Sequence, residues 1–191
     1  MDEKAEIIFM QTRLVRLASE EWHLSVEKIV ELFKKVDVFG YIEKSYGIFH
    51  CEGDEVVLDD ITEFLEGKGI KINAWFIRWI DSLAWKLLFQ NERCNQMFEI
   101  CGGREEVSGV TISKEKMDFT IDLLITMAVE EIAEETGKDS KEVLGDFLCS
   151  KTGKALYDKE TRLWCNGPSY IAELYMNEIS QRWLKVTFNR E

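Results

Sequence analysis

The sequence predicts an all-α protein, built from two similar helical units joined by a central, tryptophan-rich buried helix. Three observations support this fold class. The chain of 191 residues has one proline, Pro168, and only 12 glycines. Long stretches place apolar residues three and four positions apart, which is typical of amphipathic helices. A hydrophobic content of 46% with 12% aromatic residues indicates a folded chain rather than a disordered one.

The central helix is predicted over Asn73 to Gln90, where polar residues form only a narrow stripe. Arg78, Ser82 and Lys86 recur every fourth residue, and the apolar remainder carries three of the six tryptophans. A membrane-spanning helix is disfavoured because the uninterrupted apolar runs are far shorter than the roughly 20 residues needed. A helix lying on a membrane surface is usually basic, whereas this chain is acidic. We therefore expect a buried helix that the two units wrap.

The first unit is predicted to span residues 1–69 and to contain four helices. The pattern places them over residues 3–21, after a capping Ser25, over residues 39–46, and over residues 55–66. Gly47 is expected to end the third helix, and residues 48–51 are expected to be extended.

Residues 70–112 are predicted to hold the central helix and a linker, and residues 113–191 the second unit, with both units packed as one globular body. In the second unit, Ser113 caps a helix over residues 114–136, and Asp139 with Glu142 forms a capping box. A short helix over 154–159, an extended piece at 163–165, and a final helix with Pro168 in its first turn complete it.

An internal repeat is predicted because the two units align without a gap at a shift of 115 residues. Ser25 then falls on Ser140 and Glu27 on Glu142, and apolar positions coincide through the whole unit. Self-similarity of this kind indicates a repeated architecture.

The first unit also carries a family resemblance, in the runs SVEKIVELF, YIEKSYGIFHCEG and VVLDDITEFL within residues 5–67. These resemble an uncharacterised bacterial family of short helical proteins, and residues 117–179, with KALYDKETRLWCNGPSYIAELY, resemble a diverged relative. The resemblance covers about two-thirds of the chain. Members are often encoded beside proteins resembling ADP-ribosyltransferase toxins. The resemblance therefore implies a partner-binding or antitoxin-like role, and it supplies no catalytic residues.

The charge of the chain narrows the class of partner. The net charge is −12, and residues 1–69 hold 16 acidic and 8 basic residues, a net of −8. Such a field repels phosphate backbones and attracts basic protein surfaces, so direct nucleic-acid binding is disfavoured. The acidic N-terminus has no signal-peptide pattern, and the five cysteines have no paired CxxC spacing. We expect a cytoplasmic protein with free thiols and no cofactor or metal.

The predicted partner-binding face lies on the fourth helix. Asp59, Glu63 and Glu66 follow one another at four and three residues, so they line one side of the helix. Ile61 and Phe64 point elsewhere. The complete set of predicted site residues is Glu55, Asp59, Asp60, Glu63 and Glu66.

We therefore predict a non-enzymatic protein-binding module, inhibitor-like or antitoxin-like, whose partner is a basic surface such as that of a toxin or a nucleic-acid-binding protein. One alternative is an acidic nucleic-acid mimic of the kind phages use as inhibitors. A second alternative is a small enzyme using the His50-Cys51 region. The sequence disfavours it, because neighbours in an extended segment point to opposite faces. If experiments rule out the acidic face as the docking site, the surface around Phe39, Tyr41 and Phe49 is the next candidate.

Overall fold

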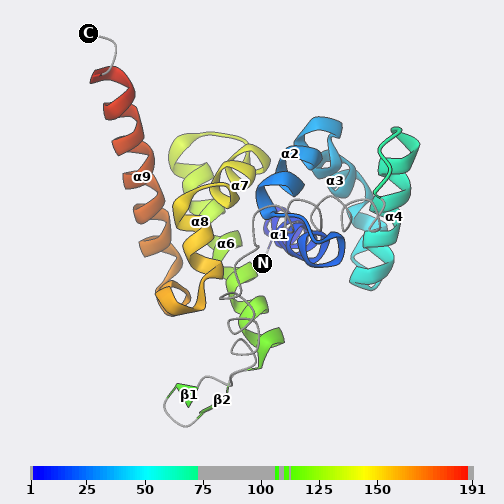
Figure 1. The fold of residues 1–191 in the computed structure, drawn as a ribbon, viewed down its shortest axis with the longest axis horizontal. Coiled ribbons are helices and arrows are strands. Elements are labelled where there is room, and N and C mark those ends of the chain that lie inside the picture. Colours follow the sequence, from blue (N-terminus) through cyan, green and yellow to red (C-terminus); the bar gives the residue numbers. More distant parts are fainter. Residues whose placement is uncertain (1, 73–105, 108–109, 112, 189–191) are drawn as a thin grey trace, which may run out of the picture.

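The computed structural model describes residues 2–72, 106–107, 110–111 and 113–188, and it confirms the all-α class (Figure 1). The first part of the chain forms α1 (Glu3–Trp22), α2 (Val26–Val36), α3 (Val38–Phe49) and α4 (Asp54–Gly67). A two-residue antiparallel pair follows, β1 (Glu106–Val107) with β2 (Val110–Thr111). The second part forms α6 (Lys114–Thr136), α7 (Ser140–Leu148), α8 (Lys151–Tyr157), the 3₁₀ turns η1 (Lys159–Thr161) and η2 (Leu163–Cys165), and α9 (Pro168–Phe188).

Several helix ends lie where the sequence predicts them, because side chains bond the free backbone groups there. The Ser113 hydroxyl accepts from the N–H of Lys116, and the Asp139 carboxylate accepts from the N–H of Lys141 at 2.9 Å. Gly137 ends α6 with a φ of 68°, a left-handed conformation that glycine adopts at no steric cost. Ser25 occupies the N-cap position of α2 but makes no capping hydrogen bond.

The third helix differs from the prediction, since α3 runs through Gly47 and ends at Phe49. Phe49 is buried, and its ring packs edge-on against Tyr41 with centroids 5.6 Å apart. Burying a phenylalanine contributes about 1.5–3 kcal/mol, more than the roughly 0.5–1 kcal/mol that a helical glycine costs. The helix therefore continues past the predicted stop, and the expected extended segment at 48–51 is wrong.

The second part has two further corrections. The short helix α8 begins at Lys151, because Ser150 caps it through the N–H of Gly153 at 2.9 Å. Residues 163–165 form a 3₁₀ turn rather than an extended piece, with the N–H of Cys165 donating to the carbonyl of Arg162 at 3.0 Å.

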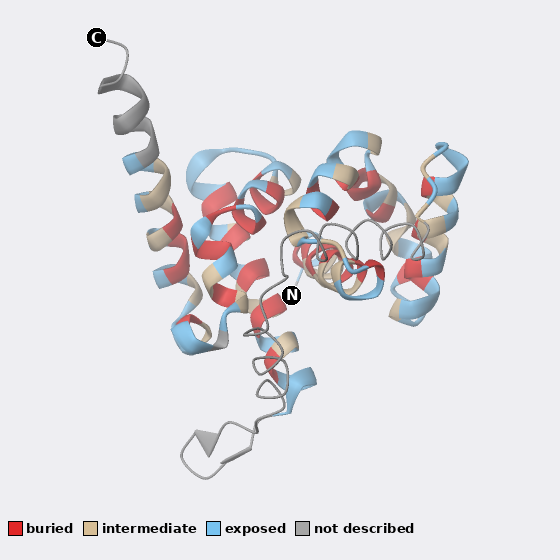
Figure 2. Cartoon of the chain, viewed as in Figure 1, coloured by how far each residue is buried: buried red, intermediate tan, exposed pale blue. Residues whose placement is uncertain are grey.

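The two parts of the chain share one hydrophobic core, because α1 packs against α6 and α2 packs against α7. Figure 2 shows buried positions on the helix faces that meet and exposed positions on the outer faces. Phe9 of α1 meets Phe119 of α6 edge-on, with ring centroids 5.4 Å apart. The repeat of two similar units stays a prediction, and the predicted central helix at 73–90 lies outside the described residues. Among the helices described above, none is long and apolar enough to cross a membrane.

Candidate functional site

The predicted partner-binding residues lie on α4, the helix at the outer edge of the first part (Figure 1). The opposite face of α4 buries four apolar residues, which anchor the helix in the core: Val57, Leu58, Ile61 and Leu65. Because these recur at helical spacing, the acidic residues between them are forced outward. Glu55, Asp59, Glu63 and Glu66 are exposed, and Asp60 is half-buried.

Two contacts fix the orientation of α4. The Arg13 guanidinium of α1 forms an ion pair with Asp54, the first residue of α4. Phe64 stacks on Tyr41 of α3, with ring centroids 4.2 Å apart and planes 11° from parallel. The acidic face is therefore presented by a helix held at both ends, which limits the entropy lost when a partner binds.

The carboxylates of this face are not neutralised within the part of the chain that the structure describes. None of the five predicted site residues makes a hydrogen bond or an ion pair through its side chain there. The nearby cation Arg13 is occupied by Asp54, and Lys68 sits over the Phe64 ring, 5.3 Å from its centroid. Among the described residues, the face thus combines exposure with uncompensated negative charge.

One apolar residue on this face was missed by the sequence prediction. Val56 is 51% exposed and lies three positions before Asp59 and seven before Glu63, so it shares their side of the helix. The sequence contains a sign of this exposure, because Val56 falls outside the helical spacing of the four buried residues that begin at Val57. Ile48, at the end of α3, is also exposed. The alternative surface around Phe39, Tyr41 and Phe49 is wrong, because Phe39 and Phe49 are buried.

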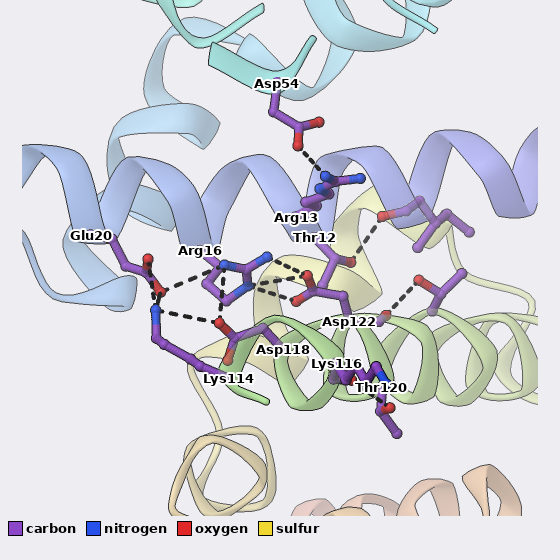
Figure 3. Close-up of polar contacts among 12 residues, drawn as sticks. Thr12, Arg13, Arg16, Glu20, Asp54, Lys114, Lys116, Asp118, Thr120 and Asp122 are labelled. Carbon is purple, nitrogen blue, oxygen red and sulfur yellow. Dashed lines mark hydrogen bonds and ion pairs between the residues drawn. The ribbon is translucent and has the colours of Figure 1, made fainter. Parts of the chain in front are cut away.

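A second cluster of charges lies between α1 and α6, and its charges compensate one another (Figure 3). The Arg16 guanidinium binds both oxygens of Asp122, with Nη2 to Oδ2 at 2.8 Å. Lys114 binds Glu20 at 3.2 Å and Asp118 at 3.4 Å. Because each carboxylate faces a cation, we interpret this cluster as a connection between helices rather than a binding surface.

Burial shapes the titration of this connection. It raises the pKa of the fully buried Asp122 carboxyl, while the hydrogen bonds and charge of Arg16 oppose that rise. Burial would lower the pKa of Arg16, but its bonds to Asp122 and the nearby carboxylates raise it above its ordinary value. Each side chain therefore keeps its charge in this buried position because the charge of the other stabilises it.

The His50-Cys51 pair adopts a geometry that the sequence prediction disfavoured. The two residues follow α3 in a turn, so their side chains are not directed to opposite faces as in a strand. Cys51 Sγ lies 3.2 Å from His50 Nε2. Among the described residues, no group of three or more His, Cys, Asp or Glu side chains is placed to hold a metal ion.

The comparisons with known proteins concern the first part of the chain. Residues 9–68, which run from α1 to just beyond α4, match the sequence model of a family described as a protein of unknown function, DUF3791. No curated protein and no solved structure matches the chain. The acidic face of α4 therefore lies within the matched segment. Two statements stay predictions: that members of the family are encoded beside toxin-like proteins, and that the second half of the chain resembles the same family.

Proposed function

We propose that this protein is a protein-binding module whose α4 face docks a basic surface of another protein. The observation that carries the proposal is the row of exposed carboxylates without a cation partner in the described structure, arranged around the exposed Val56. Docking a basic surface would compensate these charges and bury the valine. Interfaces of this kind combine an apolar centre with a charged rim that accelerates encounter.

The partner class follows from the same features. The row from Glu55 to Glu66 spans about 16 Å of helix, at 1.5 Å per residue. A basic helix or loop of a protein can match a row of this length. We propose that this docking serves an antitoxin-like or inhibitor-like role in the cytoplasm. The mimic of a nucleic acid is a distinct outcome of the binding experiment below.

The test begins with a partner captured from the native host and continues with binding kinetics on the purified pair. The variant Asp59→Lys with Glu63→Lys reverses two charges at the centre of the face. We expect its association rate to fall at least about tenfold at low salt, because steering by opposite charge is lost. The wild-type rate should also fall as salt shortens the Debye length to about 8 Å at physiological strength.

The matched control reverses two exposed carboxylates of α6, Glu134→Lys with Glu135→Lys. It changes the net charge by the same amount at a different place. An association rate that falls equally in both variants would assign the effect to net charge, and a rate unchanged by the α4 variant would exclude this face. If a nucleic acid competes with this protein for the captured partner, the protein is a nucleic-acid mimic. Thermal denaturation checks that both variants fold, as expected for exposed charges.

A further inference from the structure

The turn after α3 places a thiol and an imidazole in direct contact, and both residues are exposed. Cys51 Sγ lies 3.2 Å from His50 Nε2, within hydrogen-bonding range for sulfur. Backbone hydrogen bonds hold the turn: the N–H of Cys51 donates to the carbonyl of Ile48 at 3.0 Å, and that of Glu52 donates to the carbonyl of Phe49 at 3.1 Å. These bonds fix the backbone of the turn that carries both side chains.

The other ring nitrogen of His50 decides which tautomer is present. His50 Nδ1 lies 2.8 Å from the carbonyl oxygen of Tyr46. A carbonyl oxygen only accepts hydrogen bonds, so Nδ1 must carry the proton in the neutral ring. Nε2 then has its lone pair directed at the thiol and can accept the proton of Cys51. This is the arrangement of a nucleophile, a base and a group that orients the base.

Three contacts of His50 surround the ring that this proton transfer would charge. The Tyr46 carbonyl accepts a stronger hydrogen bond from a charged ring. His50 sits at the C-terminal end of the 12-residue helix α3, where the helix dipole favours positive charge. The Tyr46 ring stacks on the imidazole, with centroids 5.3 Å apart and planes 26° from parallel.

A pocket of about 300 Å³ opens beside His50, between α1, α3 and α4. His50 and Glu52 line it together with the apolar side chains Phe9, Met10 and Val57. The Cys51 thiol is itself exposed, so a small reagent can reach it from solvent. No pair of backbone donors for an oxyanion is needed when the electrophile is a disulfide, because exchange requires only a thiolate and access.

We propose that Cys51 and His50 form a nucleophilic thiol pair that exchanges with small disulfides, leaving Cys51 in a mixed disulfide. His50 Nε2 takes the thiol proton, and the Cys51 thiolate attacks one sulfur of the disulfide. A bond forms between Cys51 Sγ and that sulfur while the original S–S bond breaks. The leaving thiolate takes the proton back from His50 as it departs. The site is a modification site, and it does not rest on the partner-binding role of α4.

The chain contains its own comparison thiols. Cys149 and Cys165 are also free and exposed. Partial desolvation of its thiol nevertheless raises the pKa of Cys149, which makes it a poorer nucleophile. Cys165 ends η2, and the described structure gives its sulfur no histidine contact. Cys165 is therefore the reference for an exposed thiol without a base.

The experiment treats the full-length protein briefly with 4,4′-dithiodipyridine, a small neutral disulfide, and stops the reaction with acid. Peptide mass spectrometry then gives the fraction of mixed disulfide at each cysteine. We expect Cys51 to exchange at least about tenfold faster than Cys165 in the same molecule, because an unassisted thiol is only a few per cent ionised at neutral pH.

Two variants identify the cause. His50→Phe keeps an aromatic ring to stack on Tyr46 but has no ring nitrogen, so Cys51 should slow to the rate of Cys165. Tyr46→Phe keeps the backbone carbonyl and the stacking, so Cys51 should keep its rate. An unchanged rate in His50→Phe, with an unchanged melting temperature, would overturn the proposal. So would a wild-type Cys51 no faster than Cys165, a comparison that needs no variant to fold.

Discussion

Arg16 of α1 and Asp122 of α6 form a bidentate ion pair across the junction between the two parts of the chain. The guanidinium Nε lies 3.2 and 3.1 Å from the two carboxylate oxygens, and Nη2 lies 2.8 Å from Oδ2. Asp122 is fully buried, and the Arg16 side chain is 13% exposed (Figure 3). The pair therefore joins the first part of the chain to the second, and each residue compensates the charge of the other.

Arg16→Leu should destabilise the protein strongly, because it leaves the Asp122 carboxylate buried without a partner. The expected loss in the free energy of unfolding is about 3–5 kcal/mol. Adding Asp122→Leu should restore much of it, since no uncompensated charge then remains. Urea denaturation of the two single variants and the double variant measures the coupling.

The matched control is the exposed pair of Glu43 and Lys141, whose atoms lie 2.7 Å apart. Glu43→Gln should change stability by less than about 1 kcal/mol, because water screens this pair. Equal losses at the buried and exposed pairs would contradict the burial argument.

Acid should weaken the contact between α2 and α8 made by Glu27 and Lys154. The hydrogen bond from Lys154, at 2.5 Å, lowers the pKa of Glu27 from 4.5 to about 2. A carboxylate with a lowered pKa in the folded state stabilises the fold above its unfolded pKa. That contribution is therefore lost as pH falls from about 4.5 towards 2.

The measurement is the melting temperature of the wild type and of Glu27→Gln across this pH range. The difference between the two should be largest near neutral pH and should shrink as pH falls through the window. A difference that stays constant down to pH 2 would show that the ion pair does not stabilise the fold.

Tyr46 should titrate late, because its hydroxyl donates a hydrogen bond to the Glu6 carboxylate. This bond, with some burial, raises the pKa of Tyr46 from 10.0 to about 12. The raised pKa means that the stabilisation is present below pH 10 and is lost as pH rises towards 12. Glu6→Gln should bring the titration back towards pH 10, as followed by phenolate absorbance with Tyr46→Phe as the reference spectrum.

Two glycines in helices should respond in opposite ways to alanine. A Cβ at Gly153 would lie 2.2 Å from the backbone oxygen of Phe147, which cannot move aside as a flexible side chain could. Gly153→Ala should therefore cost about 1–3 kcal/mol or more. A Cβ at Gly47 would meet nothing within 4 Å, so Gly47→Ala should stabilise α3 by about 0.5–1 kcal/mol. Chemical denaturation of both variants checks the contrast, and a loss at Gly47 would argue against the extension of α3.

The acidic face could be located from the sequence because it depends on periodicity. Once Val57, Leu58, Ile61 and Leu65 are buried at helical spacing, the intervening carboxylates must face outward. The caps at Ser113, Asp139 and Gly137 were predictable for a similar reason, since each depends on residues within three or four positions. Local spacing and local hydrogen bonds therefore fixed the class of fold and the face of α4.

Other features depended on contacts between distant segments and only the tertiary structure decided them. The continuation of α3 through Gly47 follows from burying Phe49 in the core shared by both parts of the chain, and the contact of His50 with Cys51 follows from that continuation. The pairing of Arg16 with Asp122 joins residues 106 positions apart, and nothing in either local pattern specifies it. The sequence by itself determined which residues lie together on one helix, because helical geometry is local. The tertiary structure decided which helices meet and which charges are compensated, because burial depends on the packing of the whole chain.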